Sequence, residues 1–170
     1  MLDRTLLMLL FLLSGCDQKP LSEELSHQTL ADILHLVLSS NCKAYERVVL
    51  SQQNNKIFPT QLFNEAAQIM QEQGSKLSYI MLSQEPLNVR HRPITESEKT
   101  ALGFIYTHPG QVYYGEEKLG KITYFIAAYP EIGERESCII CHNTHINASK
   151  KDYQLNEVMG AMLIRLPKRI

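Results

Sequence analysis

The sequence predicts an α+β domain, with helices in its first half and an antiparallel sheet in its second half. Apolar residues recur at helical spacing in the first half. Near the carboxyl end, two segments are instead rich in β-branched and aromatic residues or alternate as a strand does. A polar segment with two cysteines separates them, so we expect a functional loop between the last two strands.

A long amphipathic helix is expected over residues 23–51. Cys42 lies on its apolar side, and His35, seven residues earlier, lies on nearly the same side. The other apolar positions of this helix are Leu30, Ile33, Leu34, Val37, Leu38, Tyr45, Val48 and Val49.

Two shorter helices are expected, each after a threonine that can accept a hydrogen bond from the backbone of the first turn. Thr60 is the expected N-cap of a helix over residues 61–73, which Gly74 ends. Thr95 is the expected N-cap of a third helix over residues 96–106.

Four strands are expected, because their residues favour extended backbone and turn residues separate them. They cover residues 77–82, 111–114, 121–129 and 158–166. The second and third are joined by an expected turn over residues 115–120, which begins and ends with glycine.

Cys138, Cys141 and His142 form a C-x-x-C-H segment, the pattern of covalent c-type haem attachment. Two thiols add to the two vinyl groups of one porphyrin, and two intervening residues give the sulfurs a matching separation. The following imidazole can then reach the iron. The sequence therefore predicts haem c attached through Cys138 and Cys141, in a polar, loop-like stretch over residues 130–149.

Other chemistries fit the same two cysteines. They could form a disulfide or a thioredoxin-like redox pair, although such a pair usually lies in a βαβ unit. They could also bind zinc together with His142 or His145. A second ligand pair at short spacing, which a zinc site needs, is not visible, so haem attachment is the favoured interpretation.

Residues 1–15 are typical of a bacterial lipoprotein signal peptide. The apolar run over residues 6–13 is too short to span a bilayer as a stable helix, and Arg4 precedes it. Leu13-Ser14-Gly15-Cys16 resembles a lipobox, which makes Cys16 the expected lipid-carrying first residue of the mature chain. The alternatives are an ordinary signal peptide or a buried N-terminal helix.

The chain is thus divided into a signal peptide, a tether over residues 16–22 and a single domain over residues 23–170. Asp17 resembles the inner-membrane retention signal of enterobacterial-type lipoproteins. Haem c attachment and lipoprotein maturation both take place outside the cytoplasmic membrane. We therefore expect a membrane lipoprotein that faces the periplasm.

Composition narrows the classes of partner and of site. The formal net charge is −1 and the basic residues are scattered, which argues against a nucleic-acid partner. Of the four cysteines, one is assigned to lipid and two to haem. Cys42 remains, and a lone thiol in an exported protein calls for an explanation.

The chain resembles the Tll0287-like haem domain family over nearly its whole mature length. The resemblance implies a PAS-like sheet and a periplasmic sensor module of the kind found in histidine kinases and chemoreceptors. We expect this chain to act through a separate partner, since it carries no recognisable signalling region. The matching elements are Asn41-Cys42, Gly74-Ser75-Lys76-Leu77-Ser78-Tyr79, Tyr113-Tyr114-Gly115, Tyr124-Phe125, Tyr129-Pro130, Glu136-Ser137-Cys138 to His142-Asn143, His145 and Val158-Met159-Gly160.

His142 is the expected proximal iron ligand, and the resemblance favours Cys42 as the distal one. As an alternative, Cys42 is a small buried apolar residue of its helix. An anionic sulfur stabilises ferric iron, so a thiolate that protonates on reduction could open a position for a diatomic gas. The other distal candidates are His35, His91, His108, His145, Met70 and Met81.

Three further residues are expected near the haem propionates. Arg90 and Arg92 lie in a proline-bounded loop and could pair with these carboxylates, or could simply be solvated. His145 is expected to bind a propionate or to cap its own loop.

The sequence favours a redox- or gas-sensing haem c module. The alternative is a small electron-transfer cytochrome. No distal His/Arg pair of a peroxidase is recognisable, so no enzymatic activity is expected.

Overall fold

The computed structural model describes residues 25–49 and 59–168. The expected signal peptide, Cys16, Asp17 and the tether over residues 16–22 lie outside the described residues. Within them, the α+β order expected from the sequence is confirmed.

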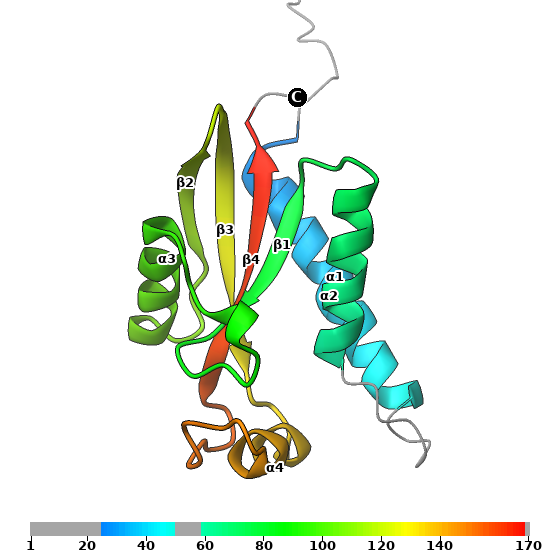
Figure 1. The fold of residues 1–170 in the computed structure, drawn as a ribbon, viewed down its shortest axis with the longest axis vertical. Coiled ribbons are helices and arrows are strands. Elements are labelled where there is room, and N and C mark those ends of the chain that lie inside the picture. The colour runs from blue at the N-terminus through cyan, green and yellow to red at the C-terminus, as the bar shows by residue number, and fades with distance from the viewer. Residues whose placement is uncertain (1–24, 50–58, 169–170) are drawn as a thin grey trace, which may run out of the picture.

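A four-stranded antiparallel sheet forms the centre of the domain. Its spatial order is β1-β4-β3-β2, so the last strand in the sequence lies inside the sheet (Figure 1). Every residue of that strand is buried, which explains its nearly continuous apolar sequence. The strands are β1 (Ser78–Leu82), β2 (Tyr113–Leu119), β3 (Ile122–Ile132) and β4 (Val158–Pro167).

Helices cover both faces of the sheet (Figure 1). The first two, α1 (His27–Val49) and α2 (Pro59–Glu72), pack on one face. The third, α3 (Glu96–Thr107), packs on the other face. The fourth, α4 (Glu136–Thr144), lies beyond the end of the sheet between β3 and β4, and a short 3-10 turn, η1 (Val89–His91), follows β1.

The expected start of α3 is confirmed in detail. The Thr95 hydroxyl accepts a hydrogen bond from the Glu98 amide, and the Glu98 carboxylate accepts one from the Thr95 amide. This capping box satisfies backbone donors that the first turn leaves unpaired.

The expected N-cap of α2 was wrong. The helix begins at Pro59, so Thr60 lies within its first turn. Proline suits the first helical position because its fixed φ is helical and its missing N–H would have no partner there. The expected end is confirmed, since Gly74 adopts a φ of +78° just after the last turn.

The expected turn over residues 115–120 was also wrong. β2 continues through Gly115, which pairs with Ile126 of β3, and Leu119 pairs with Ile122. The connection is therefore a two-residue hairpin, in which Gly120 has a φ of +59°. One glycine of the pair supplies the turn, and the other is a strand residue.

A buried ion triad joins α3 to the sheet. The Arg165 guanidinium of β4 donates to Glu117 of β2 at 2.6 Å and to Glu98 of α3 at 2.5 Å. Burial opposes ionisation of Glu98, but hydrogen bonds from the Ile94 and Thr95 amides and from Arg165 lower its pKa overall. The positive charge of Arg165 thus offsets the unfavourable removal of two carboxylates from water.

We predict that Arg165→Met destabilises the domain by roughly 3–5 kcal/mol, because it leaves two buried carboxylates without a cation. Urea unfolding measures this loss. Lys168→Met is the matched control, since Lys168 pairs with Glu116 at the surface and should cost less than about 1 kcal/mol. Equal losses in the two variants would contradict the prediction.

Candidate haem site

The C-x-x-C-H segment is helical, whereas residues 130–149 were expected to be loop-like. α4 begins after Arg135, which provides no side-chain cap, and it spans the whole motif. No apolar stripe marks this helix, because Ile139 packs inward while Ile140 is exposed. The usual sequence cues of a helix are therefore missing here.

The helix gathers the three residues of the motif on one side. Cys138, Cys141 and His142 stand at positions i, i+3 and i+4, and such positions are neighbours on a helix surface, with Cβ atoms about 5–6 Å apart. All three side chains are half-buried. Two thiols and an imidazole thus point to one side of a single short element.

The alternatives for the cysteines find little support in the described residues. The three cysteines within residues 25–49 and 59–168 form no disulfide. Over the same ranges, no three His, Cys, Asp or Glu side chains gather closely enough to hold a metal ion. Two thiols beside a single imidazole suit a porphyrin, whose vinyl groups can form bonds to the sulfurs, better than they suit a bare metal ion.

His142 has the properties of an iron ligand. Its Nδ1 is buried and has no hydrogen-bond partner among the described residues. Its ring meets the edge of the Tyr153 ring, with centroids 6.0 Å apart. Burial, together with nearby His145, lowers the pKa of His142, so the imidazole is neutral at pH 7, as metal coordination requires.

Contacts with the α4–β4 connection hold the end of α4. The Asn143 side chain donates to the Tyr153 carbonyl and accepts from the Tyr153 amide, both at 3.0 Å. His145 ends the helix, and its Nδ1 accepts a hydrogen bond from the Asn147 amide at 3.1 Å. Two roles were expected for His145, and one of them, capping of its own loop, is therefore observed.

Cys42 lies on the side of α1 that faces the sheet. It is half-buried against the apolar cluster that α1 and α2 form with the sheet. The next residue, Lys43, pairs with Glu134 at 3.1 Å, and Glu134 directly precedes the N-cap of α4. In Figure 1 the carboxyl-terminal part of α1 descends towards the end of the sheet where α4 lies.

A polar clamp fixes α1 on the sheet about three turns before Cys42. The hydroxyls of Tyr114 and Tyr129 both donate to Asp32 Oδ1, at 2.9 and 2.6 Å. Burial and the adjacent Asp32 carboxylate raise the pKa of Tyr129, so its hydroxyl stays protonated. His35 stacks on Tyr129 with centroids 3.9 Å apart, and burial lowers its pKa.

The other distal candidates are dispersed. Met70 and Met81 pack against the α1–α2 core, as apolar filler does. His91 Nε2 lies 3.3 Å from the Asn64 side chain, beside α2. His108 ends α3, on the opposite face of the sheet from α1 and Cys42, where it stacks on Phe104.

Arg90 and Arg92 are exposed in and after η1. The loop that carries them touches the α4–β4 connection, since the Asn147 side chain donates to the Leu87 carbonyl. Ser149 also donates to the Glu85 carboxylate. The two arginines therefore lie on a loop that contacts the α4 region, and their expected propionate contacts stay a prediction.

Comparison with known proteins gives one family and one fold. The profile of the Tll0287-like family, described as Tll0287, matches residues 24–167. The chain belongs to the Tll0287-like family.

A solved structure shares the fold of this Tll0287-like chain. It is described as the crystal structure of the cyanobacterial heme-protein Tll0287, and it superposes with a TM-score of 0.55 at 14% identity. The similarity covers 85% of this chain and 98% of that one. No curated protein matches the chain. Among the described helices, none is long and apolar enough to cross a membrane.

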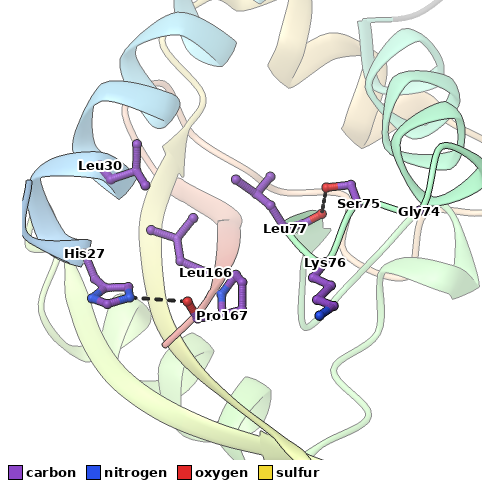
Figure 2. A pocket seen from close by; sticks show the side chains of 8 residues that line it. All are labelled: His27, Leu30, Gly74, Ser75, Lys76, Leu77, Leu166 and Pro167. Carbon is purple, nitrogen blue, oxygen red and sulfur yellow. Dashed lines mark hydrogen bonds between the residues drawn. The ribbon is translucent and has the colours of Figure 1, made fainter. Parts of the chain in front are cut away.

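An apolar cavity of about 370 Å³ lies away from the candidate site of this Tll0287-like domain. Figure 2 shows it between the start of α1, the turn before β1 and the end of β4. Leu30, Leu77 and Leu166 line the cavity, and Lys76 lies at its edge. The His27 ring is hydrogen-bonded to the Pro167 carbonyl. None of the predicted site residues lines this cavity.

The residues that seat α4 were not predicted from the sequence. A register shift in the β3–β4 ladder between Glu131 and Ile132 turns the chain out of the sheet. At Gly133, a Cβ would lie 2.5 Å from Ile139 Cδ1 and 2.8 Å from Met159 Sδ. The glycine between strand and motif was the available signal, because an isolated glycine often marks a close approach.

We predict that Gly133→Ala lowers stability by about 1 kcal/mol, because the new methyl must displace the flexible ends of the Ile139 and Met159 side chains. Thermal unfolding measures the loss, and adding Ile139→Ala to the same chain should recover part of it. Gly103→Ala is the control, since a Cβ there meets nothing within 4 Å in α3. That change should stabilise the helix by about 0.5–1 kcal/mol. A Gly133→Ala variant as stable as wild type would contradict this seating of α4.

Proposed function

We propose that this chain is a c-type haem protein in which Cys138 and Cys141 hold the haem and His142 is the proximal iron ligand. The single observation that carries the proposal is that α4 presents two thiols and a neutral imidazole on one side. The solved structure of similar fold supports it, since that protein is described as a heme-protein. A bound haem would supply an iron centre that changes oxidation state and takes an axial ligand.

Cys42 is the distal ligand in this proposal. Its support is its half-buried position on α1 and the Lys43–Glu134 pair, which ties the same turn of α1 to the segment entering α4. The Asp32 clamp fixes the rotation of α1 about its own axis. His35 is less suited to binding iron, because its ring is stacked on Tyr129.

The role that we propose is redox or diatomic-gas sensing through a separate partner protein. If haem were bound, the Cys42 thiolate would hold the iron from a helix whose ties to the α4 region are few, and protonation of that thiolate on reduction would allow Cys42 to separate from the iron and move with the helix. The Lys43–Glu134 tie is a surface ion pair, and such pairs contribute at most about 1 kcal/mol. We assign no catalytic activity to the chain.

We further propose that the domain is held at the outer side of the inner membrane by lipid on Cys16. The lipobox-like sequence, Asp17 and the haem motif support this, since all three belong to exported bacterial proteins. Arg90, Arg92 and the Nε2 atom of His145 remain the predicted partners of the haem propionates.

We predict that the chain, expressed with the c-type maturation machinery, gains the mass of one covalently attached haem. The double variant Cys138→Ala, Cys141→Ala should lose this mass, because no thioether can form. Denaturing mass spectrometry measures it, and Cys42→Ala is the matched control that should retain the haem. A wild-type chain without the added mass would remove the basis of the proposal.

We predict that Cys42→Ala changes the ferric absorption spectrum and raises the reduction potential, because an anionic sulfur no longer stabilises ferric iron. Potentiometric titration followed by absorption measures both. His35→Ala is the control and should leave the ferric spectrum unchanged. The reverse pattern would make His35 the ligand.

Carbon monoxide separates sensing from electron transfer. A reduced wild-type protein that binds the gas supports a sensor with a displaceable ligand. A reduced protein that stays six-coordinate under the gas and exchanges electrons rapidly would instead support a small electron-transfer cytochrome.

A further inference from the structure

The imidazole of His142 is enclosed by protein, but no hydrogen bond to its Nδ1 atom sets its orientation. Nδ1 is buried and has no hydrogen-bond partner within residues 25–49 and 59–168. A histidine that binds a metal ordinarily donates its second ring N–H to a carboxylate or a carbonyl, and that bond fixes the plane of the ring. In this domain the plane of the His142 ring therefore depends on packing.

The ring of Tyr153 provides that packing. The two rings are perpendicular, with centroids 6.0 Å apart, which is a favoured arrangement of neighbouring aromatic rings. Tyr153 is 3% exposed, so its ring has no solvent to turn into. A buried planar side chain at a right angle to the imidazole limits the rotation of the imidazole.

Asn143 ties the backbone of Tyr153 to the helix that carries His142. Its side chain donates to the Tyr153 carbonyl and accepts from the Tyr153 amide, both at 3.0 Å. Because Asn143 directly follows His142 in α4, these bonds hold Tyr153 against the same turn of the helix. The two rings therefore keep one relative position.

Lys150 gives the Tyr153 ring a second fixed neighbour. Its ammonium lies over the ring, 4.8 Å from the centroid. The same ammonium pairs with Asp152 at 2.8 Å and with Glu157 at 3.2 Å. The ring of Tyr153 is thus held through its backbone and also through its face.

We propose that Tyr153, held by Asn143, is a positioning residue that fixes the ring plane of His142 and keeps water from its Nδ1 atom. This role depends on the proposed binding of iron by His142. A hydrogen bond from Nδ1–H to an acceptor makes an imidazole a stronger electron donor, so a dry Nδ1–H keeps His142 a weak one. The chain then combines a weakly donating imidazole with the anionic sulfur proposed at Cys42.

The test uses the haem-loaded full chain, with the electron paramagnetic resonance spectrum of the ferric protein and the reduction potential as readouts. We expect Tyr153→Leu to change the g values, because the imidazole can then turn. The potential should fall by about 59 mV, a tenfold change in a one-electron equilibrium constant, because water reaches Nδ1 and strengthens the donor. If Tyr153→Leu does not fold, Tyr153→Met replaces it with the same expected shifts.

Three further variants separate positioning from general loss of packing. Tyr153→Phe keeps the ring and should retain the wild-type g values and potential. Phe104→Leu is the matched control, since Phe104 stacks on His108 with centroids 4.2 Å apart, on the face of the sheet opposite α1. It removes a ring beside a different histidine and should leave both readouts unchanged. Asn143→Ala should change the g values as Tyr153→Leu does.

Unchanged g values and potential in haem-loaded Tyr153→Leu would overturn the role of Tyr153, and wild-type g values in Asn143→Ala would overturn that of Asn143. A potential that rises in Tyr153→Leu would also count against it, because a rise is expected when the sulfur of Cys42 is lost. All of these results leave haem attachment in place. A wild-type chain that gains no haem mass would instead overturn the proposed function, and the role of Tyr153 with it.

Discussion

The pairing of β4 between β1 and β3 is the constraint on which the rest of the structure depends. β4 is the last strand of the chain, yet it lies inside the sheet and is buried along its whole length. Its approach to β1 is close enough that a Cβ at Gly160 would overlap the Leu82 carbonyl, so this position requires glycine. Arg165 of the same strand ties α3 to β2. The sheet is therefore complete only when the far end of the chain is in place.

That pairing also positions α4. β3 and β4 lie side by side, so the segment between them must leave and re-enter at the same end of the sheet. The register shift near Ile132 and the close approach at Gly133 turn the chain outwards, and the Asn143–Tyr153 hydrogen bonds hold the far end of the helix. Two thiols and His142 are thus presented by a short helix that is anchored at both ends.

α1 connects the proposals made for this domain. Its inner side carries Cys42 and the Asp32 clamp, and its outer side carries the exposed apolar residues Ile33, Leu36 and Val37. Because a helix moves largely as one body, a change in how Cys42 is held would also shift the exposed apolar side of α1. A proposed iron ligand and an exposed apolar surface therefore belong to one rigid element.

The amino-acid sequence was enough to predict the helix–sheet order and the N-cap at Thr95 and to reveal the C-x-x-C-H motif, because these depend on periodicity, local hydrogen bonds and spacing. It also led to the family, through motifs such as Val158-Met159-Gly160. Local sequence patterns led to wrong predictions for residues 115–120, expected as a turn, and for α4, expected as a loop. A glycine inside a strand and a helix without an apolar stripe are both determined by partners distant in the sequence. The buried side of α1, and the separation of several His and Met candidates from Cys42, became clear only from contacts in the folded domain. Those contacts join segments that only the closed sheet brings together.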